Sequence, residues 1–454
     1  MNHPFPAQVA IGAPHNAASG KYGGHVRIYE WGDGAWAQRG EDVDSESAWD
    51  RAGVAVDLNG AGDVVAVGAK ENNPQYKTNA GHVRVHQWLS GQWRQLGDDI
   101  DGEAYWDFSG CAVALSDDGY TVAIGAERNG AWDGTKSIVR AGHVRVHVWS
   151  DGAWKQRGAD IDGKATMDRS GLSVSINAEG TVVALGAPGK FGAEENDDHG
   201  SSDDDWGVPL DERTGFARVY EWGDGAWTQR GGDIAGEAAY DYAGDYQAVK
   251  LSATGDVVAV GASLNDGNGK DAGHVRVFEW AGGAWEQMGQ DIDGEIEYEN
   301  FGRSIALSAD ARTLAVGAVA GPSSTDPGVG AGPGTTRLYV WDGAAWRKRI
   351  EDIVGEDEED MSGHVALSGD GKVLAVGAGF NDASNDDAWG QDNRGHTRVF
   401  TFGSEAGAFV GEADGFAAGD QGKSKKKKKK KGAKKKKKKK KKKNQNQNQN
   451  KNKK

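Results

Sequence analysis

Cysteine, proline and long apolar runs are scarce in this chain of 454 residues. Cys111 is the only cysteine, which excludes an intramolecular disulfide. Only 9 prolines stand beside 70 glycines, a composition that suits short strands joined by tight turns. No stretch approaches the roughly 20 apolar residues of a membrane span, and none keeps the 3.6-residue apolar spacing of a helix. We therefore predict an all-β protein without a transmembrane segment.

Positive charge is also scarce outside one segment. Twenty-one of the 53 Lys and Arg residues lie in residues 423–454, which contain no acid, so the rest of the chain has 32 basic and 68 acidic residues and a net charge of −36. Such a surface repels nucleic acid and anionic membranes, so we predict no nucleic-acid partner for the folded part. Residues 411–454, rich in Lys, Asn and Gln, cannot bury apolar surface, so we expect a disordered tail that binds polyanions non-specifically.

One unit of about 60 residues recurs along the chain. Its clearest mark is a strand of the type Gly-His-Val-Arg-Val, whose arginines are spaced 57 to 73 residues apart: Arg27, Arg84, Arg145, Arg218, Arg276, Arg337 and Arg398. Short alternating segments separated by Asp-Gly and Ser-Gly turns predict four strands per unit. In one unit these are Cys111–Leu115, Tyr120–Ala126, Gly142–Trp149 and Trp154–Gly158.

Side chains are substantial on both faces of these strands, which predicts sheets packed between two neighbours, as in propeller blades. We predict a seven-bladed β-propeller of four-stranded blades over residues 1–410, with units at 1–40, 41–97, 98–158, 159–231, 232–289, 290–350 and 351–410. The first unit lacks its innermost strand, and the last has only a weak fourth strand near Ala408–Val410. We therefore expect strands from the two chain ends to close the ring; six blades and a partial unit are the alternative.

The unit resembles the FG-GAP repeat of integrin-α-type propellers. The resemblance rests on short segments that include Phe301–Leu307, Leu314–Ala318, Gly273–Val277 and Val182–Pro188. It implies a propeller that binds extracellular ligands and carries calcium in the hairpins between the first two strands. The corresponding turns here, such as Ser116–Gly119, are shorter and poorer in acids than a calcium loop. We therefore predict no cofactor and no hairpin calcium site, and leave calcium binding elsewhere open.

A recurring acid stands three residues before the glycine of each first strand, often after an aromatic residue. These positions are Asp50, Asp107, Asp168, Asp241, Glu299 and Asp360, with Trp49, Trp106, Tyr240 and Tyr298 beside them. A ring of carboxylates and aromatic rings near the propeller axis suits a sugar or cationic ligand. The alternative is that each acid accepts hydrogen bonds from its own loop. Three tryptophans outside the repeat pattern, Trp132, Trp206 and Trp389, lie in polar loops and are further candidates for ligand contacts.

The repeated arginines are predicted to be structural, each paired with a recurring aspartate such as Asp42. We predict no metal site, because histidines that recur one blade apart, such as His25 and His82, would not converge on one ion. The paired tryptophans of each unit, such as Trp31 and Trp36, are predicted to pack at the outer edge of the blade.

Enzyme motifs are lacking, and no catalytic residue is proposed from the sequence. The expected function is a monomeric, non-enzymatic binding or adhesion module for a protein or glycan ligand. The alternative is a propeller hydrolase or lyase that uses carboxylates of one face. Residues 1–14 lack a basic segment followed by an apolar run, so we expect no signal peptide. The location is left open: secreted or cell-surface if the N-terminus is truncated, otherwise cytoplasmic.

Overall fold

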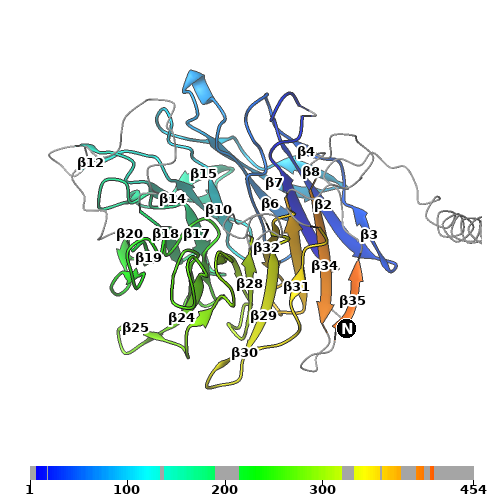
Figure 1. Cartoon of the computed structure of the whole chain (residues 1–454). Helices are drawn as coiled ribbons and strands as arrows, with labels where there is room; N and C mark the ends of the chain where they lie inside the picture. Colours follow the sequence, from blue (N-terminus) through cyan, green and yellow to red (C-terminus); the bar gives the residue numbers. More distant parts are fainter. Residues whose placement is uncertain are drawn as a thin grey trace, which may run out of the picture. The chain divides into compact units, whose positions relative to one another are not determined.

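The computed structural model describes residues 7–17, 19–132, 137–189, 214–319, 332–357, 360–379, 395–402 and 409–413. In these residues the chain is almost entirely β, apart from one short 3-10 helix, η1, at Pro74–Tyr76. No helix among the described residues has the length and apolar character needed to cross a membrane. The strands form a seven-bladed β-propeller (Figure 1), within a compact unit of residues Met1–Ala418.

The third blade shows the plan of each unit. Its strands follow one another in space as in sequence, all antiparallel: β10 (Ala112–Leu115), β11 (Thr121–Ala126), β14 (His143–Ser150) and β15 (Ala153–Gln156). The four predicted strands are found within two residues of their expected limits. A short fifth strand, β16 (Ile161–Asp162), was not predicted; it pairs with the first residues of β14 after the chain turns back from β15.

Five other blades repeat this plan in whole or in part, and we give their strands in order. The first has β1 (Gln8–Ala13), β2 (His25–Gly32), β3 (Ala35–Gln38) and β4 (Val43–Asp44); the second has β5 (Ala55–Leu58), β6 (Val64–Ala69), β7 (His82–Leu89), β8 (Gln92–Gln95) and β9 (Ile100–Asp101). The fourth has β17 (Ser173–Ile176), β18 (Val182–Ala187), β19 (Phe216–Gly223), β20 (Ala226–Gln229) and β21 (Ile234–Ala235). The fifth has β22 (Val249–Leu251), β23 (Val257–Ala262), β24 (His274–Ala281), β25 (Ala284–Gln287) and β26 (Ile292–Asp293). The sixth has β27 (Phe301–Leu307), β28 (Thr313–Ala318), β29 (Thr335–Trp341), β30 (Trp346–Lys348) and β31 (Ile353–Val354).

Each chain end forms a blade of its own, and in the described residues the first blade has no counterpart of β5, the innermost strand of the second, as predicted. The seventh blade has four strands, β32 (Ser362–Leu367), β33 (Val373–Ala378), β34 (His396–Phe402) and β35 (Phe409–Ala413), and β35 pairs with β34. At the other end, β1 pairs with β2. The expected blade shared between the two ends is therefore not what the described strands form, because the last unit supplies a fourth strand of its own. Strand pairing also continues to Ala413, three residues beyond the predicted end of the propeller.

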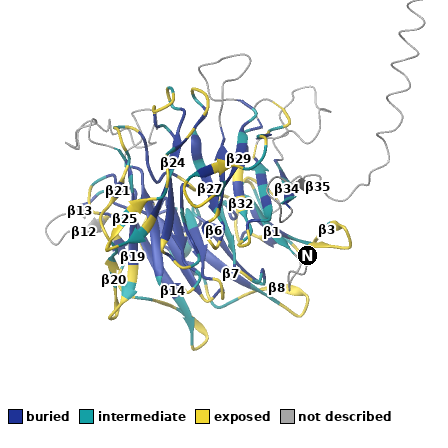
Figure 2. Ribbon diagram, turned by 90° about the horizontal axis from the view of Figure 1, so that it is seen from below, coloured by how far each residue is buried: buried dark blue, intermediate teal, exposed yellow. Residues whose placement is uncertain are grey.

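The core lies between the blades. Val275 of the fifth blade, for example, belongs to one buried cluster with Phe301, Ile305 and Leu314 of the sixth. Figure 2 shows buried residues along the inner strands and exposed residues on outer hairpins such as the one between β2 and β3. This radial packing explains why strands of the unit carry apolar side chains on both faces.

The tryptophan pairs pack at the outer strands of the blades, as predicted. They also form hydrogen bonds to the preceding blade. The rings of Trp88 and Trp93 lie 5.3 Å apart. The Trp93 indole Nε1 donates a hydrogen bond of 2.7 Å to the backbone oxygen of Arg39 in the preceding blade. The Arg39 guanidinium lies 4.8 Å from the centre of the Trp88 ring. The same indole bond to the preceding blade is made by Trp154, Trp227, Trp285 and Trp346.

Candidate functional site

The six recurring acids are anchors of their own loops. Asp241, which is 2% exposed, accepts hydrogen bonds of 2.9 and 2.8 Å from the backbone amides of Glu237 and Ala238. The same kind of bond, to an amide three or four residues earlier, is made by Asp50, Asp107, Asp168, Glu299 and Asp360. This geometry agrees with the structural alternative that we considered for them, and a role in ligand contact stays a prediction.

The aromatic residues beside these acids lie at the surface. Trp49, Trp106 and Tyr240 are 47%, 42% and 42% exposed, and Tyr298 is half-buried. Lysines cover two of the rings: the Lys21 ammonium lies 4.9 Å from the Trp49 ring centre and that of Lys270 lies 5.3 Å from the Tyr298 ring centre. These exposed aromatic rings are separate from the buried carboxylates that follow them.

The three tryptophans outside the repeat pattern cannot be placed in a site. Trp132 belongs to β12 (Ala131–Trp132), which pairs with β13 (Ser137–Ile138), and its side chain lies outside the described residues. Trp206 and Trp389 also lie outside the described residues. Their proposed ligand contacts stay predictions.

The repeated arginines make two kinds of hydrogen bond, to an aspartate or to a backbone oxygen. In the first, fourth and sixth blades the guanidinium bonds the predicted aspartate, as in the 3.0 Å bond from Arg27 Nε to Asp42; the others are Arg218 with Asp233 and Arg337 with Asp352. Elsewhere the arginine reaches a backbone oxygen of the preceding blade, as Arg145 does at Asp101; the others are Arg84, Arg276 and Arg398. Both arrangements join strands or blades, which suits the predicted structural role.

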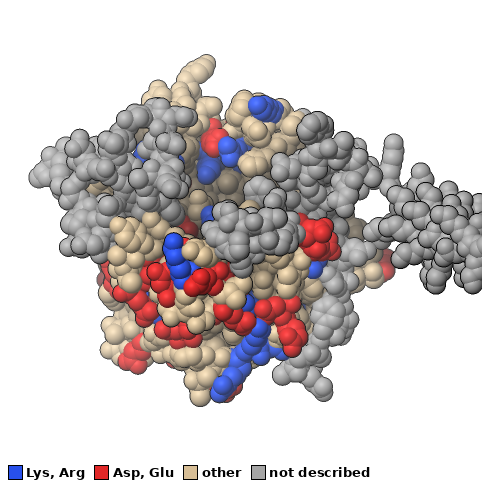
Figure 3. Space-filling model, viewed as in Figure 1, with Lys and Arg blue, Asp and Glu red and all other residues tan. Residues whose placement is uncertain are grey.

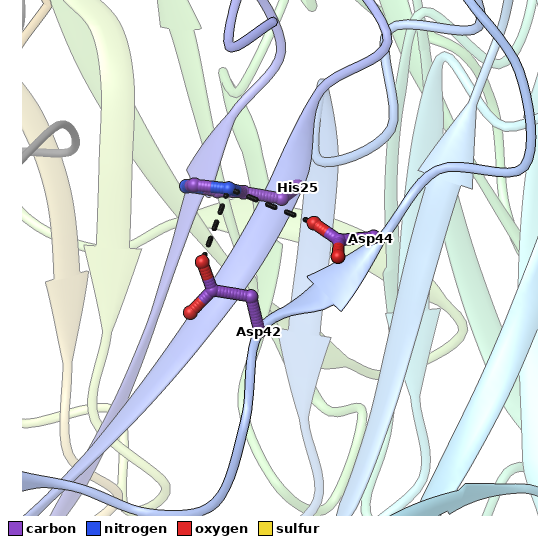
Figure 4. Close-up of side chains that lie close together, drawn as sticks. All are labelled: His25, Asp42 and Asp44. Carbon is purple, nitrogen blue, oxygen red and sulfur yellow. Dashed lines mark ion pairs between the residues drawn. The ribbon is translucent and has the colours of Figure 1, made fainter. Parts of the chain in front are cut away.

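The recurring histidines meet carboxylates of their own or the preceding blade. Figure 4 shows the first case: His25 Nδ1 lies 3.4 Å from Asp42 Oδ2 and 3.9 Å from Asp44 Oδ1. Related groups form around His82, His143 and His274. Burial, reinforced by the charge of Arg145, lowers the pKa of His143 to about 4, which keeps its imidazole neutral. Our argument against metal sites assumed ligands from different histidines, and it overlooked these acids.

A different set of polar residues lies where the innermost strands begin. The position directly after the first-strand glycine holds Val54, Cys111 and Leu172 in the second to fourth blades, but Asp245, Arg303 and His364 in the fifth to seventh. Asp245 and Arg303 interact electrostatically, and so do Arg303 and His364. Together with Tyr246 and the ion pair of Glu127 and Arg169, we call these three residues the axial cluster.

The Glu127–Arg169 pair is the buried base of the axial cluster. The side chains are 4% and 6% exposed, and the Arg169 Nε donates a hydrogen bond of 2.9 Å to Glu127 Oε2. Burial works against ionisation of Glu127, but the guanidinium of Arg169 and the charges of Lys70 and Arg128 lower its pKa below the usual value. The pair is therefore charged on both sides at neutral pH.

Asp245 is the most perturbed carboxyl of the axial cluster. It is 3% exposed, and its Oδ1 has no hydrogen-bond partner among the described residues. Burial raises the pKa of Asp245 to about 6; Arg303 opposes this rise, and Glu127 adds to it. A carboxyl with this pKa can both accept and return a proton near neutral pH, as a general base must.

The more accessible members of the axial cluster are Tyr246, Arg303 and His364. Tyr246 is 37% exposed, and the Arg303 guanidinium lies 4.8 Å from its ring centre. His364 is exposed on β32, but the surrounding protein and the charge of Arg303 lower its pKa to about 4. At neutral pH the axial cluster thus offers a neutral imidazole, a guanidinium and a phenol to a ligand.

Neither the models of known protein families nor the curated proteins contain a match to this chain. Solved structures do match its fold. A propeller named for 6-phosphogluconolactonase activity from Bacteroides uniformis superposes with a TM-score of 0.53 at 12% identity, over 89% of this chain and 94% of that one. The periplasmic gluconolactonase of Pseudomonas aeruginosa gives a TM-score of 0.53 at 14% identity, over 91% and 96% of the two chains. At such low identity the likeness establishes the fold, and the resemblance to FG-GAP repeats is not confirmed.

These comparisons correct two of our expectations. The similar propellers are named as lactonases, which speaks against the expected non-enzymatic binding or adhesion module and for the hydrolase that we gave as the alternative. The candidate residues that we took from the sequence were mostly positions that recur from blade to blade. The position after the first-strand glycine departs from this, since Asp245, Arg303 and His364 differ from one blade to the next. That variable position, read down the aligned units, is the signal that could have located the axial cluster.

Proposed function

We propose that the chain is a propeller hydrolase that opens a lactone at the axial cluster. The observation that carries this proposal is the buried carboxyl of Asp245, which has an unpaired oxygen and a pKa of about 6. Unlike the repeated acids, it occupies a position where no other blade has a carboxylate. Perturbed carboxyls of this kind concentrate at functional sites, and the names of the similar structures support lactone hydrolysis.

The chemistry needs one proton acceptor and one positive charge. Asp245 takes a proton from a water molecule as the water oxygen forms a bond to the lactone carbonyl carbon. The carbonyl oxygen becomes negative, and the Arg303 guanidinium stabilises it. The bond between that carbon and the ring oxygen then breaks, and Asp245 returns the proton to the ring oxygen. The product is the open hydroxy acid, and Asp245 is again ionised.

Access to this carboxyl is restricted in the described structure. Tyr246 follows Asp245 in the chain and is more than a third exposed, whereas Asp245 itself is almost enclosed. The neutral imidazole of His364, which interacts with the same guanidinium, is placed to hydrogen-bond a hydroxyl of the substrate.

The charge of the cluster favours an anionic sugar lactone. Lys70, Arg128 and Arg169 interact with the carboxylate of Glu127, and Arg303 and Arg169 with that of Asp245, so the cations outnumber the acids among these groups. Such a local excess attracts a phosphate or carboxylate group. We therefore propose a phosphorylated sugar lactone as the preferred substrate and an uncharged one as the poorer substrate.

Replacement of Arg303 tests the proposed site. We expect Arg303→Met to lower kcat for hydrolysis of 6-phosphogluconolactone by about 100-fold or more, as the loss of an oxyanion-stabilising group does. Release of acid is followed with a pH indicator and corrected for spontaneous ring opening. Arg312→Met is the matched control, because Arg312 is exposed in the turn between β27 and β28. A wild-type rate equal to the spontaneous rate, or equal activity of the two variants, would contradict the proposal.

A further inference from the structure

The groups around the recurring histidines have the composition of metal sites. In three places a histidine meets a glutamate of the preceding blade and an aspartate of its own blade, with one ligand atom of each within 4.8 Å of the others: Glu46–His82–Asp99, Glu103–His143–Asp160 and Glu237–His274–Asp291. We call these the interblade triads. They lie at another position of the repeat than the axial cluster, so they are independent of the proposed hydrolysis.

The separation between histidine and aspartate in the triads is that of two ligands that share an ion, while the glutamate oxygen lies farther away, within 4.8 Å. His82 Nδ1 lies 3.5 Å from Asp99 Oδ2, and His143 Nδ1 lies 3.6 Å from Asp160 Oδ2. A good hydrogen bond between such atoms is 2.7 to 3.2 Å long. Two ligands bound to one ion at about 2.0 to 2.2 Å each are held roughly 3 to 3.6 Å apart. The observed separations fit the second arrangement.

His143 gives the strongest indication. It is 1% exposed, and neither of its ring nitrogens has a hydrogen-bond partner among the described residues. Its Nδ1 faces Asp160, whose other oxygen, Oδ1, accepts a hydrogen bond of 2.7 Å from Gln156. The glutamine thereby turns Oδ2 toward the imidazole, as partners of metal ligands commonly do. A buried imidazole without a partner is costly unless something binds it.

The fourth blade contains a natural counterpart without the histidine. Phe216 stands at the histidine position and Lys164 at the glutamate position. The Lys164 ammonium lies 3.7 Å from Asp233, and Arg218 bonds the same carboxylate. The two ligands have thus been replaced together, and a lysine supplies the positive charge beside the aspartate.

In the sixth blade, too, a lysine lies beside the acids. Thr335 replaces the histidine, while Glu295 and Asp352 keep the two acids. The Lys348 ammonium bridges them at 3.0 Å from Glu295 and 2.5 Å from Asp352. In the interblade triads the residue equivalent to Lys348 is a glutamine, as at Gln95 and Gln156. Where the histidine is lost, a lysine ammonium therefore lies beside the aspartate, in addition to the repeated arginine that lies beside the acids in both kinds of blade.

We propose that each interblade triad binds one divalent transition-metal ion, such as Zn²⁺, which bridges two neighbouring blades. One imidazole nitrogen and two carboxylate oxygens suit zinc or a similar ion better than calcium, which prefers oxygen ligands alone. Glu46, Glu103 and Glu237 are about half exposed, which leaves an entry path for the ion. The repeated arginines Arg84, Arg145 and Arg276 lie 3.5 to 3.8 Å from the triad glutamates without a hydrogen bond to them. The group of His25, Asp42 and Asp44 is not included, because there Arg27 hydrogen-bonds both carboxylate oxygens of Asp42.

Metal titration of the full, untagged chain tests this proposal. After removal of metals with a chelator, we expect calorimetry with ZnCl₂ at 0.15 M NaCl to give three equivalents, and gel filtration followed by elemental analysis to retain them. His143→Phe, which copies the fourth blade at Phe216, is expected to lower the number from three to two. Glu103→Gln is expected to do the same or to weaken one site at least tenfold.

Glu295→Gln is the matched control, since Lys348 already neutralises that position, and it should keep three equivalents. Cobalt loading provides a second measurement: visible absorption bands typical of nitrogen and oxygen ligands should fall by a third in His143→Phe. The proposal is overturned if the wild-type chain retains no metal, if His143→Phe retains as much as wild type, or if Glu103→Gln and Glu295→Gln lower binding equally. The last result would mean non-specific binding to an acidic surface.

Discussion

At the scale of single residues, function depends on departures from the repeat. Positions that are alike in every unit, such as Asp241 and its counterparts, anchor loops. Positions that vary, such as Asp245, Arg303 and His364, bring unlike groups together at the inner ends of successive blades. In a repeat protein the identical residues hold each unit to its neighbours. The residues that differ are therefore the better guide to chemistry.

The buried carboxyl of Asp245 should destabilise the folded protein at neutral pH. Its pKa rises from 3.8 to about 6 on folding, so the folded state binds the proton more tightly than the unfolded state does. The free energy of unfolding therefore falls as pH rises from about 4 to about 6 and stays lowered above that range. Two pKa units correspond to about 3 kcal/mol.

Asp245→Asn should remove this pH-dependent cost. We expect the free energy of unfolding of the variant, relative to that of wild type, to rise by up to about 3 kcal/mol between pH 4 and pH 8. Urea unfolding at the two pH values measures the difference, and Asp98→Asn, at an exposed acid between β8 and β9, is the control. A variant whose stability relative to wild type is the same at both pH values would show that Asp245 ionises normally.

At the scale of strands and blades, close contact between glycines sets the distance between neighbouring blades. A Cβ atom built on Gly186 of β18 would lie 2.0 Å from the backbone oxygen of Gly244 in the next blade. Gly244 directly precedes Asp245, so this contact also positions the proposed base. The equivalent contact recurs at Gly12, Gly68, Gly125, Gly261 and Gly317.

Gly186→Ala should therefore affect stability and activity together. We expect a loss of about 1 to 3 kcal/mol from the free energy of unfolding, the usual cost of overpacking, and a fall in lactone hydrolysis as Asp245 is displaced. Gly223→Ala in β19 of the same blade is the control, since no atom lies within 4 Å of its added Cβ. If both variants unfold at the same urea concentration and hydrolyse lactone equally, the glycine contact does not position the site.

Much of the blade could be predicted from the sequence, because strands and turns depend on neighbouring residues. The recurring arginine strand and the Asp-Gly turns located all four strands of the third blade. The short strand β16 was missed, since two residues carry no periodic signal. The axial cluster was missed for another reason: Glu127 and His364 are far apart in sequence and come together only when the ring of blades forms.

At the scale of the whole molecule, the site differs from its surroundings in charge. Acidic side chains gather on the lower part of the face in Figure 3, as the net charge of −36 outside the tail requires. Four cations nevertheless converge on the axial cluster. A positive site in a negative protein discriminates among ligands by charge, repelling anions elsewhere and binding them at the axis.

The pH dependence of lactone hydrolysis tests the central claim most directly. We predict that kcat/KM for 6-phosphogluconolactone, after subtraction of spontaneous ring opening, rises with pH through a midpoint of about 6 and then levels off, because Asp245 must be ionised to accept a proton. In Asp245→Asn this rise should disappear and the rate should drop by about 100-fold or more. A wild-type chain with no activity above the spontaneous rate, or a variant that keeps both the rate and its pH dependence, would contradict the account.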